Sequence, residues 1–313
     1  MIPHLTTFSM GIALPGGYQR PKERGQVPIV TSIINLKGGV GKTTLTLAMA
    51  HFLAIEHQKR VLVIDLDPQT NATVCLITED EWQKRDETGR TLYQLFLDQV
   101  KGSHQFQPDA SIVRNVSNVG GGVQGLDLLP SSLRLIKVQD RVTQITDFET
   151  YEKGPIFALR DTLADYLPYY EHVLIDCPPS LGVVTLNGLA ISDSYIIPVV
   201  PDTLSLLGVP PILDRVEHFG NRTRRNIRAL GIVVSKMRAH TLLHNEMLRR
   251  LREDFVLRRY PTIFQTVIPE STRIAEAANV MAPINTLQQK YGNGGPYDEL
   301  SALTREYLSY ASQ

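Results

Sequence analysis

Short apolar runs alternate with amphipathic stretches along most of the chain, beginning at residue 29. Residues 29–34, 61–64, 126–129, 172–175, 195–200 and 231–235 are rich in aliphatic and β-branched side chains, which predicts strands. Because nearly every position in these runs is apolar, we expect strands that are covered on both faces. Residues 43–55, 156–167 and 241–254 have helical spacing of apolar positions, and a further helix is expected near 91–100.

The order of these elements predicts the fold class. A strand, a glycine-rich loop, a helix and a second strand follow one another between residues 29 and 64, as in a right-handed parallel crossover. The continued alternation favours an α/β fold with a doubly wound, mostly parallel sheet flanked by helices, and ligands at the carboxyl ends of the strands. We interpret residues 77–125 as an elaboration on this sheet, residues 1–28 as a flexible arm, and residues 29–313 as a single domain.

Composition narrows the functional classes. The 313 residues include 32 Lys or Arg and 32 Asp or Glu, so a uniformly basic nucleic-acid coat is excluded while a local basic face is not. Two cysteines, Cys75 and Cys177, are too few for a disulfide scaffold or a four-cysteine metal site within one chain. No apolar run approaches the 18 residues of a membrane span, and the N-terminus lacks a signal peptide's basic region. We therefore expect a cytoplasmic protein.

The strongest chemical signal is the sequence KGGVGKTT at residues 37–44, between a predicted strand and a predicted helix. Its glycines let backbone N–H groups turn toward phosphate oxygens, and the helix directs its positive end to the same point. Lys42 is placed to reach the β- and γ-phosphates, and the Thr43 hydroxyl to bind Mg²⁺. Where the usual loop begins with glycine this chain has Leu36, and a second lysine, Lys37, enters the loop. The predicted nucleotide-binding residues are Gly38, Gly39, Val40, Gly41, Lys42, Thr43 and Thr44. The alternative is a glycine-rich turn without a ligand.

Two predicted strands end in carboxylates. Asp65 and Asp67 follow the run at 61–64, and Asp176 follows the run at 172–175. In this architecture such side chains face the ligand site, so we predict that Asp65 and Asp176 join Thr43 at Mg²⁺. Asp67 is predicted to orient the attacking water. The alternative is that Asp65 or Asp67 only caps the turn before proline.

Together these motifs resemble the ParA/Soj branch of the deviant Walker A ATPases, which also contains MinD. The likeness includes residues 37–44, 65–73, 126–132, 176–182 and 267–277, and it extends over residues 29–285. One departure is Thr70, where ParA proteins usually have glycine. The resemblance also implies that adenine lies between residues 235–236 and 268–270, with Pro269 as the candidate contact. The alternative for this proline is a role in the turn alone.

The resemblance implies a molecular switch that uses ATP and Mg²⁺. ATP-bound chains form a homodimer in which Lys37 reaches the partner's phosphates, and Lys37, Lys42 and Asp67 are the expected catalytic residues. The dimer binds DNA without sequence preference, and a ParB-like or centromere-binding adaptor protein stimulates hydrolysis. Repeated cycles on the nucleoid then position or segregate a plasmid or chromosome cargo.

One segment could supply the DNA-binding surface. Residues 214–259 contain twelve Arg or Lys and five Asp or Glu, in a chain whose net charge is zero. Such charges neutralise DNA phosphates, so binding would weaken steeply with salt. The alternative is a solvated basic face with no ligand. The candidate DNA-binding residues are Arg238, Arg273, Lys236, Arg249 and Arg250.

Other functions share the phosphate loop. A MinD-like, membrane-associated positioning ATPase would need a basic amphipathic C-terminal helix, but residues 297–313 contain three acidic residues and one basic residue. A ParA-like positioner of a protein organelle would use the same switch. A bacterial tyrosine kinase would need a tyrosine-dense tail, for which Tyr297, Tyr307 and Tyr310 are thin support. A nitrogenase-reductase-like protein would need two cluster-ligating cysteines in each subunit, but Cys177 follows the predicted Mg²⁺ carboxylate and Cys75 lies in a different context. We therefore expect DNA, and not a membrane, as the binding surface.

Overall fold

The computed structural model describes residues 27–146, 154–256, 261–277 and 284–312, so nearly all of the predicted arm at 1–28 lies outside the described residues. One parallel sheet has the strand order β3-β2-β4-β1-β5-β6-β7. Its strands are β1 (Ile29–Ile33), β2 (Val61–Asp65), β3 (Leu126–Leu129), β4 (His172–Asp176), β5 (Ser194–Val199), β6 (Arg228–Met237) and β7 (Ile263–Pro269). The predicted fold class, a doubly wound α/β sheet, is confirmed.

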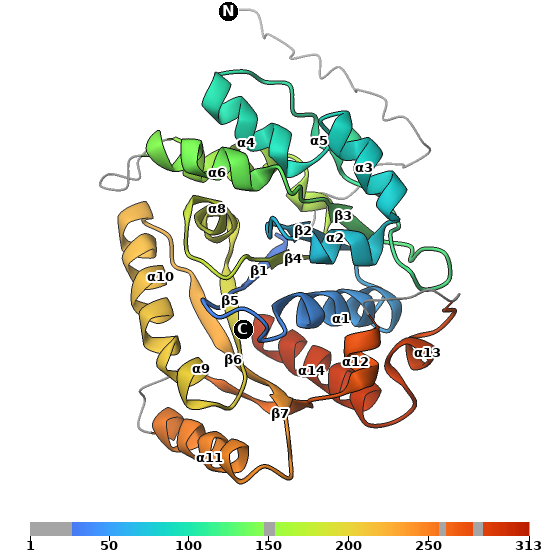
Figure 1. Cartoon of the computed structure of the whole chain (residues 1–313), viewed down its shortest axis with the longest axis vertical. Helices are drawn as coiled ribbons and strands as arrows, with labels where there is room; N and C mark the ends of the chain where they lie inside the picture. The colour runs from blue at the N-terminus through green and yellow to red at the C-terminus, as the bar shows by residue number, and fades with distance from the viewer. Residues whose placement is uncertain (1–26, 147–153, 257–260, 278–283, 313) are drawn as a thin grey trace, which may run out of the picture.

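Helices connect the strands and cover both faces of the sheet (Figure 1). The N-terminal half contains α1 (Lys42–Ile55), α2 (Asn71–Leu76), α3 (Glu79–Glu87), α4 (Leu92–Lys101), α5 (Pro108–Ser111) and α6 (Leu135–Gln144). The central part contains α7 (Ala158–Leu163), α8 (Val183–Ile191), α9 (Thr203–Leu207) and α10 (Val209–Thr223). The C-terminal part contains α11 (Leu242–Val256), α12 (Thr272–Glu276), α13 (Leu287–Tyr291) and α14 (Pro296–Ala311).

The helices form two layers with separate apolar cores. Side chains of α4, α6, α7, α8 and α10 pack on one face of the sheet. On the other face, α1 and α14 lie against each other and are flanked by α2, α12 and α13 (Figure 1). All five residues of β2 are buried, which is the pattern expected of a strand covered on both faces.

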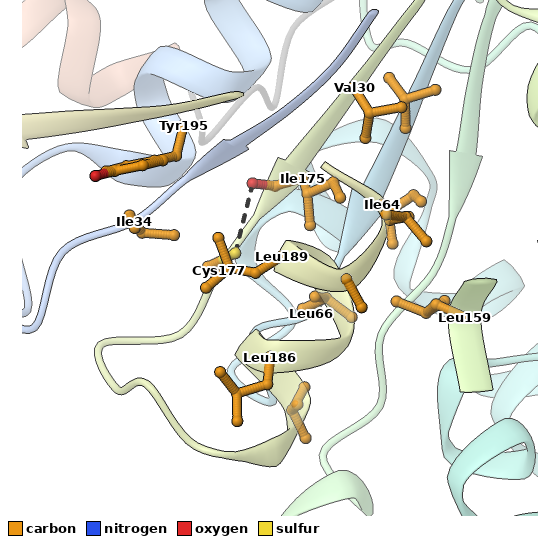
Figure 2. Close-up of a cluster of buried hydrophobic side chains, with 14 of the residues drawn as sticks. Val30, Ile34, Ile64, Leu66, Leu159, Ile175, Cys177, Leu186, Leu189 and Tyr195 are labelled. Atoms are coloured by element: carbon orange, nitrogen blue, oxygen red, sulfur yellow. Dashed lines mark hydrogen bonds between the residues drawn. The ribbon is translucent and has the colours of Figure 1, made fainter. Parts of the chain in front are cut away.

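The core between the sheet and α8 is closely packed (Figure 2). A Cβ atom added to Gly188 would lie 2.8 Å from Leu66 Cδ1 and 3.2 Å from Ile175 Cγ2. Only glycine therefore allows α8 to approach the strands this closely. Cys177 is fully buried in the same cluster, and its thiol donates to the Ile175 carbonyl oxygen over 3.8 Å. Burial also raises the pKa of this thiol, so it acts as an apolar filler.

Three local predictions differ from the structure. The helix predicted at 156–167 is limited to α7 and is flanked by 3₁₀ turns at Pro155–Phe157 and Leu167–Tyr169, because proline stands near each end. Strand β6 begins three residues before the predicted start. Strand β7 was not predicted, because this edge strand is only partly buried and has polar residues, Gln265 and Thr266, at its centre.

Candidate functional site

Strand register brings the predicted motifs to one edge of the sheet. Asp176 of β4 pairs with Asp65 of β2 on one side and with Ile33 of β1 on the other. The phosphate loop leaves β1 immediately after Ile33 and leads into α1. The loop and the acidic strand ends therefore meet at the carboxyl edge, where the doubly wound fold places its ligands.

Backbone conformation shapes the phosphate loop. Gly39 and Gly41 have φ values of +76° and +89°, in the left-handed region that glycine adopts at low cost. Gly41 is the N-cap of α1, so the loop ends at the positive pole of this helix. The Ser235 hydroxyl holds the loop from β6 by donating to the Val40 carbonyl oxygen over 2.6 Å.

Lys42 lies inside the loop. Its ammonium group donates to the carbonyl oxygens of Asn35 and Lys37, each over 3.3 Å. The side chain is buried, and burial lowers the pKa of Lys42 against the attraction of Asp176 and Asp67. A cation surrounded by loop carbonyls is well placed to exchange these neutral acceptors for phosphate oxygens.

The acidic cluster contains one carboxylate oxygen that is not satisfied. Thr43 donates its hydroxyl to Asp176 Oδ2 over 2.6 Å, while the buried Asp176 Oδ1 has no hydrogen-bond partner among the described residues. Burial raises the pKa of Asp176 to about 7, against the hydrogen bond from Thr43. A hydroxyl beside a carboxylate with a free oxygen is a donor set suited to Mg²⁺. Within the described ranges, no three His, Cys, Asp or Glu residues form a metal cluster, so further ligands would have to be phosphate oxygens and water.

Asp65 is engaged by the segment that follows β2. Its Oδ2 accepts hydrogen bonds from the Thr73 backbone N–H and hydroxyl, over 2.8 and 2.7 Å, and its Oδ1 accepts from the Asp67 N–H over 3.1 Å. Burial and the nearby charge of Asp176 raise the pKa of Asp65 well above its usual value. These contacts favour a role in holding residues 65–73 over direct binding of a metal.

Asp67 lies at the start of this segment. Its carboxylate accepts a hydrogen bond from the Gln69 N–H over 2.9 Å, and its carbonyl oxygen accepts one from the Ser131 hydroxyl over 2.7 Å. Thr70, the residue that departs from the family pattern, has φ of 58°. The turn therefore has the left-handed backbone that glycine usually provides, although this position carries a β-branched residue.

Lys37 points away from Lys42 and toward the start of α9. Its ammonium group donates to both carboxylate oxygens of Asp202, over 3.1 and 2.8 Å, and to the Ser205 hydroxyl over 3.0 Å. Burial opposes ionisation of Asp202, but the hydrogen bonds from Lys37 and Ser205 hold the pKa of this carboxyl below its usual value. Sequence reasoning missed Asp202 and Ser205; an Asp-x-x-Ser helix start was visible, but its proximity to Lys37 was not.

A cavity, here called the Pro269 pocket, borders the phosphate loop on the side of β6 and β7. It has a volume of about 160 Å³ and is lined by Gly41, Thr44, Lys236, Pro269 and Glu270 with six further residues. Pro269 therefore faces the phosphate loop across a cavity, at the place where the resemblance predicts adenine. The Ser235–Lys236 strand end lies on the same wall.

The candidate DNA-binding residues are exposed but do not form one surface. Lys236 and Arg238 are at the carboxyl end of β6, where Arg238 makes a two-pronged ion pair with Glu270. Arg273, in α12, donates to the Gln289 carbonyl oxygen. Arg249 and Arg250 lie on α11 and pair within that helix with Glu253 and Glu246.

The basic segment at 214–259 is divided by β6. Strand β6 begins at Arg228 and ends at Met237. Arg228 and Arg238 therefore lie near opposite ends of this ten-residue strand, about 30 Å apart. Arg258 and Arg259 lie outside the described residues.

Two membrane-related observations concern the described residues only. None of their helices is both long and apolar enough to cross a bilayer. The C-terminal helix α14 packs on α1 and β7, with Leu300, Leu303 and Tyr307 fully buried.

Comparison with known proteins gives concordant results. A family model described as an AAA domain matches residues 29–229. The chain is 34% identical over 246 residues to the chromosome-partitioning ATPase Soj of Thermus thermophilus, covering 79% of this chain and 83% of that protein. It is 29% identical over 255 residues to the sporulation initiation inhibitor protein Soj of Bacillus subtilis, covering 82% and 89%. Cobyrinic acid a,c-diamide synthase of Mycobacterium smegmatis, solved with an ATP analog and magnesium, has a TM-score of 0.67 at 25% identity and covers 90% of this chain and 96% of that chain.

Proposed function

Because this chain belongs to the ParA/Soj branch of the ParA/MinD superfamily of P-loop ATPases, we propose that it is an ATP-dependent, dimerising ATPase that positions a DNA cargo. The observation that carries this proposal is the orientation of Lys37. Its ammonium group contacts α9 and not its own phosphate loop, and its side chain is 40% exposed. A partly exposed lysine that does not contact its own phosphate loop can serve the phosphates of a second copy.

Charge compensation explains why ATP would favour the dimer. In the single chain, Asp202 neutralises Lys37. In the dimer, each Lys37 would leave Asp202 and bind the partner's triphosphate, whose greater negative charge offsets the lost ion pair. ADP lacks the γ-phosphate that makes this exchange favourable, so hydrolysis would release the two chains.

The remaining residues would perform hydrolysis within each chain. Lys42 would bind the β- and γ-phosphates, and Thr43 and Asp176 would hold Mg²⁺ together with the nucleotide. When bound, Mg²⁺ supplies positive charge that stabilises the charge developing on the phosphoryl oxygens. Asp67 would orient water toward the γ-phosphate, and Asp65 would hold the segment that carries Asp67 through Thr73.

DNA would bind to charges that adjoin the nucleotide. Lys236, Arg238 and Arg273 are exposed, and each lies in or within a few residues of the lining of the Pro269 pocket. Dimerisation would present two such sets to one duplex. Arg238 would have to exchange Glu270 for a DNA phosphate, which adds a cost that contacts from both chains can offset.

The partners and location follow from this cycle. A ParB-like or centromere-binding adaptor protein would stimulate hydrolysis, and the ATP-bound dimer would reside on the nucleoid. The relative named chromosome-partitioning ATPase Soj supports a DNA cargo over a protein organelle. The packed C-terminal helix supports DNA, and not a bilayer, as the surface to which the dimer binds.

Fluorescence anisotropy with a labelled duplex of arbitrary sequence tests the proposal. We expect binding with a nonhydrolysable ATP analogue and Mg²⁺ and none with ADP, with affinity falling by at least tenfold between 50 and 200 mM salt. The Arg273→Ala variant should bind roughly fivefold to tenfold more weakly because it removes a phosphate contact from each chain. Arg160→Ala removes an exposed arginine of α7 and serves as the control. Equal binding with ADP and with the ATP analogue would contradict the proposed switch.

A further inference from the structure

Besides the Pro269 pocket, a separate cavity adjoins the phosphate loop. Its volume is about 310 Å³, and its walls come from α1, α2, α12 and α13. Figure 1 shows α1 between α2 on one side and α12 with α13 on the other. The cavity shares only Thr44 and Ile274 with the Pro269 pocket, so a nucleotide with its base against Pro269 would leave most of it free.

Lys290 gives this cavity a buried positive charge. The residue is 3% exposed, and the hydrogen-bond acceptor of its ammonium group is the neutral side-chain oxygen of Asn118. Of the described residues, no Asp or Glu lies within 4.0 Å of the ammonium group. Burial lowers the pKa of Lys290 to about 8, which still leaves most of it protonated at neutral pH.

The neighbouring groups do not neutralise this charge, although the Tyr291 ring faces the ammonium group with its centroid 5.7 Å away. His51 is fully buried close by, and burial together with the charge of Lys290 lowers the pKa of His51 well below its usual value, so it is neutral. The burial of Cys75 raises the pKa of its thiol to about 11, so it too is neutral. The cluster therefore contains one cation and no anion.

The rest of the lining suits a small anion with an apolar body. No acidic side chain lines the cavity. Thr44 and Asn71 contribute a hydroxyl and an amide group, while Leu47, Val74 and Ile274 contribute apolar surface. Thr43 also lines the cavity, but its hydroxyl donates to Asp176. We propose that this cavity is a second ligand site, separate from the nucleotide site, for a small molecule whose phosphate or carboxylate group pairs with Lys290. The proposal does not depend on dimerisation or on DNA binding.

The site would be coupled to the nucleotide through shared elements. Thr43 and Thr44 belong to the phosphate loop, and Asn71 opens the helix that follows Asp67. A ligand that fixes α2 against α1 would therefore bias the segment that positions the attacking water.

Calorimetric titration with two probes, inorganic phosphate and succinate, tests the site. The protein is first saturated with a nonhydrolysable ATP analogue and Mg²⁺, so that the phosphate loop is filled. We expect at least one probe to bind, and Lys290→Met to weaken that binding at least tenfold. Lys101→Met, which removes an exposed lysine at the end of α4, should bind as the wild type does. If inorganic phosphate binds, the ligand carries a phosphate group; if succinate binds, the ligand carries a carboxylate group.

A second variant guards against loss of fold. Val74 is 43% exposed, so Val74→Trp can place its ring in the cavity while Lys290 is retained, and it should also abolish probe binding. Without ligand, Lys290→Met should melt at the same temperature as the wild type or higher, because it removes a buried cation that no carboxylate of the described residues neutralises. Failure of both probes to bind, or equal binding by the wild type and both variants, would overturn the proposal. A lower melting temperature with unchanged binding would identify Lys290 as purely structural.

Discussion

A single backbone position illustrates what the site requires of its residues. Thr70 adopts φ of 58° between Asp67 and α2, which costs a residue with a Cβ atom about 1–2 kcal/mol relative to the right-handed region. Glycine, which the family resemblance leads us to expect there, would avoid this cost. The turn is retained in spite of the threonine because Asp65 and Ser131 hold the segment on either side.

Replacing Asp67 should slow ATP hydrolysis without changing ATP binding. Asp67→Ala should lower the rate of ATP hydrolysis at least 100-fold, because general-base and water-positioning groups contribute about 10²–10⁴-fold. The affinity for ATP should stay within a few fold, since Lys42 and the loop amides are unchanged. Steady-state hydrolysis and equilibrium binding of the analogue check both expectations. Normal turnover by the variant would remove Asp67 from this role.

Single residues were predictable where the chain itself brings them together. The phosphate loop and the carboxylates at strand ends could be recognised because parallel strands share one carboxyl edge. Asp202 and Lys290 could not, since each meets its neighbours only after folding: Asp202 lies 165 residues from Lys37, and Lys290 lies 172 residues from Asn118. No local pattern encodes such pairs.

At the scale of elements, the start of α9 would control the release of Lys37 in the proposed cycle. Asp202 is the N-cap of α9 and accepts a hydrogen bond from the Ser205 N–H over 2.7 Å. Asn is also a good N-cap, so Asp202→Asn should keep the helix while removing the charge that holds Lys37. We expect dimerisation with the ATP analogue to tighten by up to roughly 25-fold, because each of the two chains no longer breaks a partly exposed ion pair and such a pair contributes up to about 1 kcal/mol. Sedimentation equilibrium measures this, and weaker dimerisation would instead make Asp202 a requirement of the paired state.

The docking of α14 should make stability depend on pH. The Tyr307 hydroxyl lies 3.2 Å from His172 Nδ1 and 3.2 Å from the Thr31 hydroxyl. Burial, with a smaller effect of the Lys59 charge, lowers the pKa of His172 to about 4. The unfolded chain, whose histidine pKa is about 6.5, therefore binds more protons below that pH, and stability falls as the pH falls.

Comparison with His172→Gln isolates this contribution. Between pH 7 and pH 5, the free energy of unfolding of the wild type should fall by about 2 kcal/mol more than that of the variant. Urea unfolding at the two pH values provides the measurement. Parallel losses in the two proteins would mean that His172 is not buried in its neutral form.

Strands and helices could be predicted from the sequence where both of their faces are buried. β2 and β4 are buried on both faces and appear as continuous apolar runs. β7 escaped prediction because an edge strand is only half buried, and α7 is shorter than predicted because prolines interrupt the helical pattern at both ends. Amphipathicity alone does not show where such elements begin.

For the whole molecule, the net charge of zero conceals an uneven distribution. Lys236, Arg238 and Arg273 lie at the nucleotide edge, whereas Arg228 lies at the opposite edge of the sheet. The sequence predicted basic content but not this division, which depends on the direction in which β6 crosses the molecule. A DNA surface formed at the nucleotide edge would be completed by the second chain.

The most direct test is a crystal structure with a nonhydrolysable ATP analogue and Mg²⁺. We predict two copies facing each other, with Lys37 released from Asp202 and its ammonium group about 3 Å from a phosphate oxygen of the analogue bound to the partner. A single chain in which Lys37 remains bound to Asp202 and Ser205 would contradict the account.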